Sequence, residues 1–271
     1  MKKGCVIIIY NKKITESITY NSIKDSNLNI LLFDNSTKEE CLNYNLNYTQ
    51  DKNLNYISKN KNLGLSKAYN LAINYFKDKN ISHLILFDDD TNVSNEYLSL
   101  LNNFKFIDNV CYAPIIYNEN KIVNPTYHDD NYLIEYFKIK NYNTIDDIKK
   151  IVKTNKLFAI NSGLIIPYKI FEKFHYDEKI FLDCVDHYFC REIYKLGYYI
   201  DIFPAELKQT YNVCNLNKNT KKANDHRLDI RLKDIKAYDS NNYLINKLVV
   251  LGVYFKNTKD IYYLKKIFKR Y

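Results

Sequence analysis

The sequence predicts an α/β fold in which a mostly parallel central sheet is flanked by helices. Three observations support this prediction. The chain has 271 residues, 46% of them hydrophobic, which suffices for one large α/β domain or for one domain with a small appendage. Short apolar runs rich in β-branched residues are typical of buried parallel strands. Segments with apolar residues at helical spacing lie between these runs, and such alternation is typical of βαβ units.

The first half of the chain holds the clearest elements. The run Cys5–Tyr10 predicts the first buried strand, and further apolar runs predict strands at 30–34, 54–58, 83–87 and 110–116. A helix is predicted to begin at Ser66, which would cap it. Its apolar side chains recur at helical spacing, at Ala68, Tyr69, Ala72, Ile73 and Phe76. A second helical pattern runs from Glu96 to Phe106.

The second half is less regular. Residues 119–156 are polar and predict an insertion with a helix at 144–152. The elements predicted after the insertion are a strand at 157–166, a helix from Lys169, a helix at 186–196 that ends at Gly197, and a strand at 198–203. Beyond Asn215 the pattern becomes polar and helical. We therefore predict a main domain over residues 1–215 and a basic helical extension over 216–271.

The composition limits the conclusions that charge alone supports. The chain is rich in Asn, Lys, Ile and Tyr, has five Gly, four Pro and no Trp, and carries a formal net charge of +9. This bias indicates a skewed codon pool, so single Asn and Lys residues are weak signals. A basic protein still favours phosphate-bearing ligands or anionic membrane surfaces.

The cysteines and the N-terminus indicate the compartment. The six cysteines, at positions 5, 41, 111, 184, 190 and 214, form no C-x-x-C pair and suggest neither zinc nor a disulfide framework. Cys5 and Cys111 lie in apolar runs and are predicted to be buried thiols, which fits a reducing cytoplasm. The first apolar run is too short for a signal peptide, and no run approaches the ~18–20 residues of a membrane span. We expect a cytoplasmic protein, soluble or peripheral on the inner face of the cell membrane.

The strongest chemical signal is the acidic triplet Asp88-Asp89-Asp90, which follows an apolar strand. Ligands of open α/β sheets bind beyond the carboxyl ends of the strands. Three adjacent carboxylates repel one another unless a cation lies among them, and a hard divalent cation that bridges to phosphate oxygens would neutralise them. Asp88 and Asp90 alternate onto the same side of an extended chain, as one site requires. The alternative is a solvated acidic turn.

Three further motifs each combine a chemical role with an ordinary structural alternative. Asp34 ends a strand and could accept the N3–H of uracil or thymine, although Asp34-Asn35-Ser36 is also common turn chemistry. Gly64 permits a close backbone approach before a helix N-terminus that favours anions, or it belongs to a plain loop. Asp186 could act as a general base on a sugar hydroxyl, or it caps a helix.

Taken in order, these motifs resemble family 2 glycosyltransferases of the GT-A fold, and most of all the branch of rhamnosyltransferases and galactofuranosyltransferases of bacterial surface polysaccharides. Each motif alone is weak to moderate, but the ordered set is specific and spans residues 5 to about 203. The residues that carry the resemblance are Ile9-Tyr10-Asn11, Asp34-Asn35-Ser36, Asn62-x-Gly64-x-Ser66-x-Ala68-x-Asn70, Asp88-Asp89-Asp90, Asn161-Ser162-Gly163, and Phe181-x-Asp183-x-x-Asp186 with Arg191 and Gly197.

The resemblance implies a GT-A domain over residues 1–215, with a donor half at about 1–115 and an acceptor half at about 157–215. It implies an inverting enzyme that moves a single sugar from a UDP- or dTDP-sugar to a saccharide or lipid-linked saccharide acceptor. Such an enzyme would serve the synthesis of a bacterial surface polysaccharide, for example a capsule or an O-antigen. The implied cofactor is Mn²⁺ or Mg²⁺.

The resemblance also implies roles for single residues. Asp34 would contact the donor base, Asp88 the ribose, and Asp90 would be the metal ligand of the D-x-D motif. Asp186 matches the catalytic base. The remaining donor-binding residues are Tyr10, Asn11, Asn62, Gly64, Lys67 and Asp89, and the acceptor side would be lined by Asp183, His187 and Arg191.

The sequence departs from the family pattern in two places. Many relatives carry a second acidic residue near the base, where this chain has His187, so the resemblance does not define its acceptor contacts. The Q-x-x-R-W motif of processive synthases is excluded because the chain has no Trp. This favours the addition of a single sugar. Some relatives use a C-terminal His as a further metal ligand, and His226 is the candidate here, with an ordinary surface histidine as the alternative.

The C-terminal tail suggests a membrane contact. From Asn242 onward the residues are apolar and basic, with Asp260 as the only acidic residue. This pattern fits an amphipathic segment on anionic lipid, close to a lipid-linked acceptor. The alternative, at least as well supported, is a helix that packs on the domain or in an oligomer.

Two other functions are compatible with an α/β core. A sugar nucleotidyltransferase would normally have a Gly-rich phosphate loop after the first strand, but the segment 10–13 contains no Gly. A non-catalytic nucleotide-sugar-binding module would keep the fold, although the presence of both Asp90 and Asp186 disfavours it. Nucleic-acid binding is not expected, because no recognised motif appears and the acidic triplet would repel phosphate in the absence of a cation.

Overall fold

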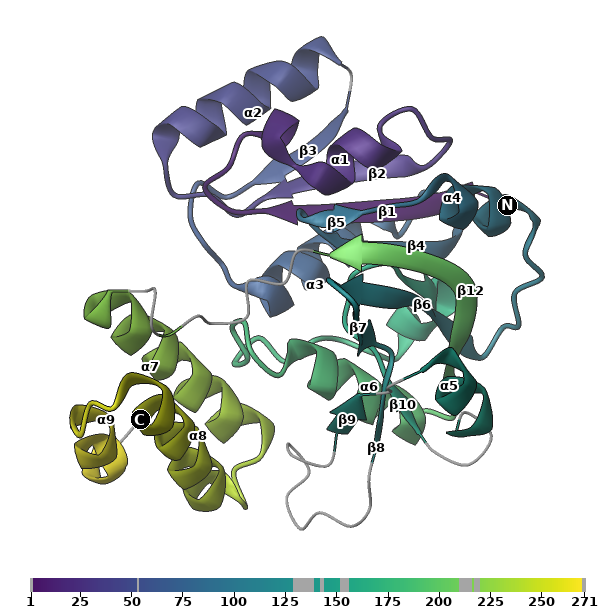
Figure 1. Ribbon diagram of the computed structural model, residues 1–271. Coiled ribbons are helices and arrows are strands. Elements are labelled where there is room, and N and C mark those ends of the chain that lie inside the picture. Colours follow the sequence, from purple (N-terminus) through teal and green to yellow (C-terminus); the bar gives the residue numbers. More distant parts are fainter. Residues whose placement is uncertain are drawn as a thin grey trace.

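The computed structural model describes residues 2–52, 54–128, 139–141, 144–151, 156–209, 216 and 220–269. These residues form an α/β body and a helical C-terminal extension that lies at one side of it (Figure 1). The predicted fold class is confirmed, with a mostly parallel central sheet, flanking helices and a helical extension.

The parallel part of the central sheet brings its strand ends to one edge. The strands run in the order β3-β2-β1-β4, with bounds Asn55–Ser58, Asn29–Asp34, Lys2–Ile9 and Ile81–Asp88. Ile9 lies opposite Asp34 and Ile8 lies opposite Asp88. The two aspartates therefore flank the end of β1 at the edge where ligands of open α/β sheets bind.

The sheet continues from β4 as a mixed sheet in the order β11-β6-β12-β5. The bounds are Leu164–Pro167, Val110–Asn118, Tyr199–Gln209 and Thr91–Asn92, and β7 (Lys121–Asn124) pairs with β6. The strand β11 is antiparallel to both β4 and β6, whereas β12 runs parallel to β6. At its end, β12 is antiparallel to β5, and Gln209 pairs with Thr91. This pairing carries Gln209 to the acidic triplet.

Successive side chains of β1 enter different buried layers, because neighbours on a strand point to opposite faces. Val6 and Ile8 belong to the layer that contains the apolar side chains of α3 (Leu65–Phe76). Cys5 and Ile7 belong to the layer that contains Tyr20 of α1 and Tyr97 of α4. Both faces of β1 are buried, which explains its unbroken apolar run.

The other helices of the body are α1 (Ile18–Ile23), α2 (Glu39–Asp51), α4 (Asn95–Asn103), α5 (Ile145–Ile151) and α6 (Val185–Lys195), with 3-10 turns η1 (Ile14–Glu16) and η3 (Tyr168–Glu172).

A small antiparallel sheet, in the order β10-β8-β9, lies beside the central one. Its strands β8 and β9 come from the region predicted as an insertion, and β10 follows that region. Its bounds are Leu157–Phe158, Thr126–His128 and Ile139–Asn141. The helix predicted at 144–152 is present as α5.

The C-terminal extension consists of α7 (Lys221–Tyr238), α8 (Tyr243–Thr258), α9 (Tyr262–Lys265) and the 3-10 turn η4 (Lys266–Phe268). The segment after α8 folds back onto the two long helices. Lys266 forms ion pairs with Asp225 and Asp229 of α7, both at 3.3 Å, and Lys247 of α8 donates hydrogen bonds to backbone carbonyls of the returning segment. None of the described helices has the length and apolar composition needed to cross a membrane.

Several predicted boundaries were wrong for identifiable reasons. The strand predicted at 157–166 is two strands, because the turn Asn161-Ser162-Gly163 separates β10 from β11. The last strand extends beyond 203, to Gln209. Neither Ser66 nor Asp186 caps a helix, because Gly64 precedes α3 and Cys184 precedes α6 at those positions. The helices α1 and α2 were not predicted at all. Cys5 and Cys111 are fully buried, as predicted, whereas Cys214 lies outside the described residues.

Candidate active site

The acidic edge of the sheet is held together by hydrogen bonds from three elements. Asp88 ends β4, and its Oδ2 accepts hydrogen bonds from Ser162 Oγ at 3.0 Å and from Gln209 Nε2 at 3.3 Å. The same Gln209 nitrogen donates to Asp90 Oδ1 at 2.8 Å. Thr91 Oγ1 lies 2.9 Å from Ser162 Oγ and completes the cluster. One amide nitrogen thus lies between the two outer carboxylates of the triplet.

The electrostatics of this edge favour a cation. Burial, together with the negative charge of Asp90, raises the pKa of Asp88 to about 6. Burial also raises the pKa of Asp90, against the hydrogen bond from Gln209 that lowers it. Two carboxylates within reach of one point, in a site that disfavours their charge, fit a hard divalent ion. The described residues include no group of three His, Cys, Asp or Glu side chains that could hold a metal ion, so further ligands here would have to be amide, hydroxyl, water or phosphate oxygens.

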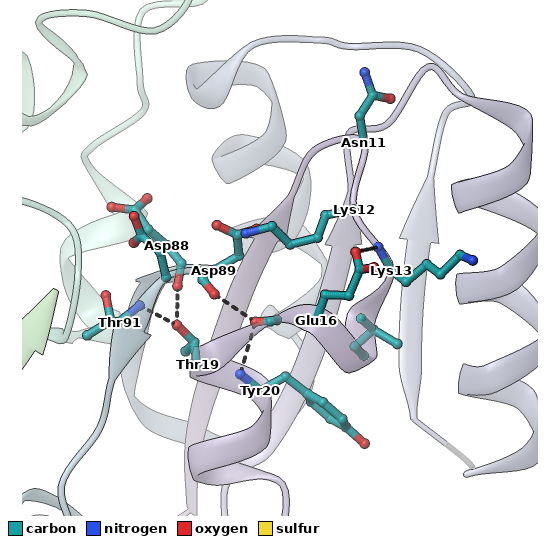
Figure 2. A network of polar contacts seen from close by, with 12 residues as sticks. Asn11, Lys12, Lys13, Glu16, Thr19, Tyr20, Asp88, Asp89 and Thr91 are labelled. Atoms are coloured by element: carbon teal, nitrogen blue, oxygen red, sulfur yellow. Dashed lines mark hydrogen bonds and ion pairs between the residues drawn. The ribbon is translucent and has the colours of Figure 1, made fainter. Parts of the chain in front are cut away.

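The middle carboxylate of the triplet points elsewhere. Asp89 forms an ion pair with Lys12 at 2.6 Å, on the loop that follows β1 (Figure 2). The start of α1 supports the triplet backbone, since Thr19 Oγ1 donates to the Asp88 carbonyl at 2.5 Å and Ser17 Oγ donates to the Asp89 carbonyl at 3.0 Å. Thr91 N–H in turn donates to Thr19 Oγ1 at 3.0 Å. Asp89 therefore links the triplet to the β1 loop, while Asp88 and Asp90 face Gln209.

Asp34 is fully buried, and three donors engage its carboxylate. Ser36 N–H donates to Oδ1 at 3.0 Å, and Asn45 Nδ2 and Tyr56 OH donate to Oδ2 at 2.8 and 3.1 Å. A direct contact of Asp34 with a base would require one of these partners to be replaced. The observed arrangement orders the loop after β2.

That loop is connected to two other loops of the predicted donor half. Asn35 accepts from Leu63 N–H at 2.8 Å and donates to Asn62 Oδ1 at 3.0 Å. Asn11 has a left-handed backbone, with φ 50°, and its Oδ1 accepts from the backbone N–H groups of Thr37 and Lys38 at 2.8 and 2.9 Å. The motifs around 11, 35 and 62 thus form one hydrogen-bonded unit.

Gly64 is required by both its conformation and its surroundings. Its φ of +79° lies in the left-handed region, and an added Cβ would be 2.6 Å from the Phe181 carbonyl oxygen and from its ring. Leu65 N–H donates to that same carbonyl at 2.6 Å. The loop that precedes α3 and the loop that precedes α6 therefore touch through backbone atoms.

A cavity of about 750 Å³ opens beside this contact. Three of the predicted donor-binding residues line it, namely Tyr10, Asn62 and Gly64. Its opposite wall is α7, which contributes His226, Arg227, Ile230 and Lys233. His226 thus lies in the cavity wall, and Lys67 lies on α3 in a 3.6 Å ion pair with Glu178, another residue of the cavity.

Asp186 lies in the first turn of α6. Burial and the charge of Asp88 raise its pKa to about 8, against a hydrogen bond from the Asn161 backbone that lowers it. The Asp88 carboxylate is therefore close enough to Asp186 to favour its protonated form. The side chains of Tyr69 and Asn161 are buried in this region. Burial raises the pKa of Tyr69, the charges of Asp88 and Asp186 raise it further, and the side-chain amide of Asn161 lowers it. Tyr69 therefore lies within electrostatic reach of both Asp88 and Asp186.

The three residues predicted for the acceptor side lie against α7. Asp183 forms ion pairs with Arg227 at 2.7 Å and with Arg231 at 3.5 Å. Arg191 donates to the Tyr238 carbonyl at 3.0 Å and stacks over the Tyr238 ring. Burial lowers the pKa of His187 to about 4, so this imidazole is neutral near pH 7. In this arrangement Asp183 and Arg191 join α6 and its preceding loop to the extension.

Sequence reasoning missed several residues of the site. Gln209 lies beyond the predicted end of its strand, and Tyr69 was interpreted only as a core position of a helix. Asp234 of α7 was not singled out, yet its carboxylate accepts the backbone N–H groups of Phe181, Leu182 and Asp183 at 2.7, 2.8 and 2.7 Å.

The chain is similar to several known proteins. Over 234 residues the chain is 26% identical to the dTDP-rhamnosyl transferase RfbF of Shigella flexneri, a match that covers 78% of this chain and 72% of that protein. Its fold is similar to that of the Pyrobaculum calidifontis mannosyltransferase PcManGT in complex with GDP-Man and Mn²⁺, with a TM-score of 0.58 at 10% identity over 89% of this chain and 64% of that one. It is also similar to S. aureus TarS 1-349 in complex with UDP-GlcNAc, with a TM-score of 0.51 at 14% identity over 95% and 82% of the two chains.

The two structural similarities establish the fold alone, which is the predicted GT-A fold. Residues 5–174 match the protein family described as Glycosyl transferase family 2. This match covers more than half of the sequence and contains the acidic triplet, the Asp34 motif and the loop at Gly64. The chain therefore belongs to glycosyltransferase family 2.

Proposed function

We propose that this glycosyltransferase moves a single sugar, with inversion, from a UDP- or dTDP-sugar to a hydroxyl of a saccharide or lipid-linked saccharide, and that it requires Mn²⁺ or Mg²⁺. The observation that carries the proposal is the position of Asp186. A partly buried carboxylate with a raised pKa, next to an acidic edge that fits a cation, is the arrangement that a direct displacement needs. The nucleotidyltransferase and the non-catalytic module are not favoured in this family.

The donor nucleoside would occupy the cavity between the donor loops and α7. Tyr10 is 52% exposed and offers its ring for stacking on a base. Asn62 and the backbone at Gly64 lie on the same wall, and the basic side chains of Arg227 and Lys233 lie opposite. Lys12, Lys67 and Asp89 lie on loops and on α3 around this region and are proposed to complete the polar surroundings of the donor.

The diphosphate would lie between this cavity and the acidic edge. Asp88 and Asp90 are the residues that would hold the cation, since a single nitrogen lies within hydrogen-bond distance of both. A bound divalent cation would stabilise the charge that develops on the departing diphosphate. The contacts of Asp34 with the base and of Asp88 with the ribose are further proposals, as is the alternative that His226 contributes to the cation.

Asp186 would perform the proton transfer. In the proposed reaction the acceptor hydroxyl loses its proton to the Asp186 carboxylate, and its oxygen attacks the anomeric carbon. The bond from that carbon to the diphosphate oxygen breaks, and the nucleoside diphosphate leaves on the opposite face. One displacement gives inversion, without a sugar bound covalently to the enzyme. Burial raises the affinity of Asp186 for the proton, which suits a general base near neutral pH.

The similarity to a dTDP-rhamnosyl transferase makes dTDP-rhamnose the first donor to test, and it supports a place in bacterial surface-polysaccharide synthesis. The experiment is calorimetric titration of the protein with UDP-, dTDP- and GDP-sugars, with Mn²⁺ and then with a chelator. We expect one UDP- or dTDP-sugar to bind, and its binding to disappear with the chelator. Donor binding that is unchanged by the chelator would refute the cation requirement.

Two variants separate the donor and base roles. Asp90→Ala should abolish the cation-dependent part of donor binding, whereas Asp186→Asn should leave donor binding intact and remove transfer. Asp201→Asn, an exposed carboxylate on β12, is the matched control and should behave as the wild type. Near-normal transfer by Asp186→Asn would show that another group is the base.

A peripheral membrane contact is proposed for the extension, now centred on α8. This helix exposes Leu244, Ile245, Leu248, Val249 and Val253, and Phe268 is 89% exposed nearby in sequence. The segment from 242 onward contains a single acidic residue, so an anionic lipid surface is the partner that its charge favours. Leu244→Glu with Leu248→Glu should reduce co-sedimentation with phosphatidylglycerol vesicles and leave donor binding unchanged. Equal vesicle binding by the double variant would refute this contact.

A further inference from the structure

Gln209 occupies the point at which a cation would meet the acidic edge. Its Nε2 lies 3.3 Å from Asp88 Oδ2, 2.8 Å from Asp90 Oδ1 and 3.4 Å from Ser162 Oγ. The side chain is 5% exposed and is anchored by the pairing of Gln209 with Thr91 at the end of β12. A nitrogen that donates to two carboxylates at once partly neutralises their repulsion, as a metal ion would.

The oxygen of the Gln209 amide, unlike its nitrogen, has no hydrogen-bond partner among the described residues. Gln209 Oε1 is buried and accepts no hydrogen bond from any described residue. A buried acceptor without a donor is costly, and it calls for an explanation in a native structure. The amide nitrogen cannot coordinate a cation, but the amide oxygen is a hard ligand of the kind that Mg²⁺ and Ca²⁺ accept.

We propose that Gln209 is the third protein ligand of the catalytic cation and that it exchanges its two amide ends when the cation binds. In the cation-free protein, Nε2 bridges Asp88 and Asp90. When the ion enters, the amide turns by half a rotation about its last side-chain bond, and Oε1 points to the ion beside Asp88 Oδ2 and Asp90 Oδ1. This rotation brings Oε1 into contact with the ion and moves the amide N–H groups away from it.

The neutrality of the amide has a consequence for the donor. Two carboxylates balance the charge of one divalent ion, and a neutral third ligand leaves that balance unchanged. The cation therefore keeps its attraction for a nucleotide diphosphate. A third carboxylate at position 209 would bind the ion more tightly but would give the site a net negative charge and repel the diphosphate. Gln209 is thus suited to an ion that must bind protein and donor together.

This inference rests on the proposed cation dependence, and the test separates the two. Mn²⁺ binding is measured by the loss of the electron paramagnetic resonance signal of free Mn²⁺, with the protein alone and with UDP or dTDP. The variants are Gln209→Leu, Gln209→Glu and Gln50→Leu, the last an exposed glutamine on α2 that serves as the control. Circular dichroism melting verifies that each variant is folded.

We expect Gln209→Leu to weaken Mn²⁺ binding by about tenfold or more, and Gln50→Leu to have no effect. Gln209→Glu should bind Mn²⁺ alone more tightly than the wild type and should lose affinity for the nucleotide in the presence of Mn²⁺. If Gln209 were only a structural bridge, Gln209→Leu would instead bind Mn²⁺ more tightly, because removal of the amide would free the carboxylates for the ion. Unchanged or tighter Mn²⁺ binding by Gln209→Leu would therefore overturn the role of Gln209.

Gln209→Glu decides the matter if the leucine variant does not fold, because it keeps the size and one oxygen of the side chain. Mn²⁺ binding to Gln209→Glu that equals that of the wild type would overturn the inference. If the wild type binds no Mn²⁺ with either nucleotide, the cation requirement itself fails, and Gln209 is left as a structural bridge.

Discussion

The contact between Asp234 and the loop before α6 predicts that a distant helix controls the proposed catalytic base. Asp234 is fully buried on α7, and its two carboxylate oxygens accept three consecutive backbone N–H groups, from residues 181 to 183, at 2.7–2.8 Å. These residues immediately precede α6, which carries Asp186. Asp234→Ala would leave the three donors without their acceptor.

The expected cost follows from the geometry. A hydrogen bond to a charged group contributes about 1.5–3 kcal/mol, and removal of one partner of a buried network costs about 3–5 kcal/mol. Opening of the loop would let water reach some of the donors, so we expect a loss of about 3 kcal/mol in the free energy of unfolding. Asp234→Asn keeps one acceptor oxygen and should lose about half as much.

The assay is urea unfolding followed by circular dichroism, together with steady-state transfer kinetics. Asp229→Ala is the control, because Asp229 lies on the same helix but forms partly exposed ion pairs with Lys266 and Lys269, worth about 1 kcal/mol or less. We expect Asp234→Ala to lower kcat/KM for the acceptor as well as stability. A loss of stability no larger than that of the control, with normal kinetics, would refute this reasoning.

Four further predictions concern single residues. The raised pKa of Asp186, about 8, predicts that kcat/KM increases with pH through that value, because only the carboxylate form accepts the proton; a flat profile between about pH 6 and pH 9 would contradict it. Gly64→Ala should destabilise the protein by about 2 kcal/mol or more in thermal unfolding, because its Cβ would meet Phe181 at 2.6 Å and φ is +79°. Gly252→Ala, within α8 with nothing within 4 Å of the added Cβ, should instead stabilise by about 0.5–1 kcal/mol. His187 has a folded pKa of about 4, below the usual value of 6.5, so the unfolded chain takes up a proton first and stability falls as pH decreases from 6.5 towards 4. That loss should amount to about 3 kcal/mol at most and should be absent from His187→Asn, as measured by urea unfolding at several pH values.

The fold was predictable because its parallel strands are buried on both faces. The runs at 5–10, 30–33 and 84–87 are apolar without interruption, and the polar residues of a motif follow each one. The helices α1 and α2 were not predicted, since their sequences are polar and their burial depends on few side chains, such as Tyr20 and Cys41. The local sequence pattern was sufficient to predict the strands, whereas these two helices depend on tertiary packing.

The predicted site was incomplete because two of its residues act through pairing across the chain. From Phe203 to its end, β12 alternates buried and exposed residues, with Phe203, Ala205, Leu207 and Gln209 on the buried side. Pro204 interrupts the strand pattern in the sequence, so the predicted strand ended at Phe203 and did not include Gln209. Asp234 contacts a segment about fifty residues earlier in the chain, and no local pattern announces such a partner.

The backbone contact between Leu65 and Phe181 has a thermodynamic consequence for the order of events. The loop at Gly64 belongs to the proposed donor site, and the loop at Phe181 leads to the base, so each loop forms part of the other's boundary. If donor and acceptor both stabilise this contact, each ligand raises the affinity of the protein for the other, because linkage between two sites is reciprocal. An acceptor that tightens donor binding must itself be held more tightly, by the same factor, once the donor is in place.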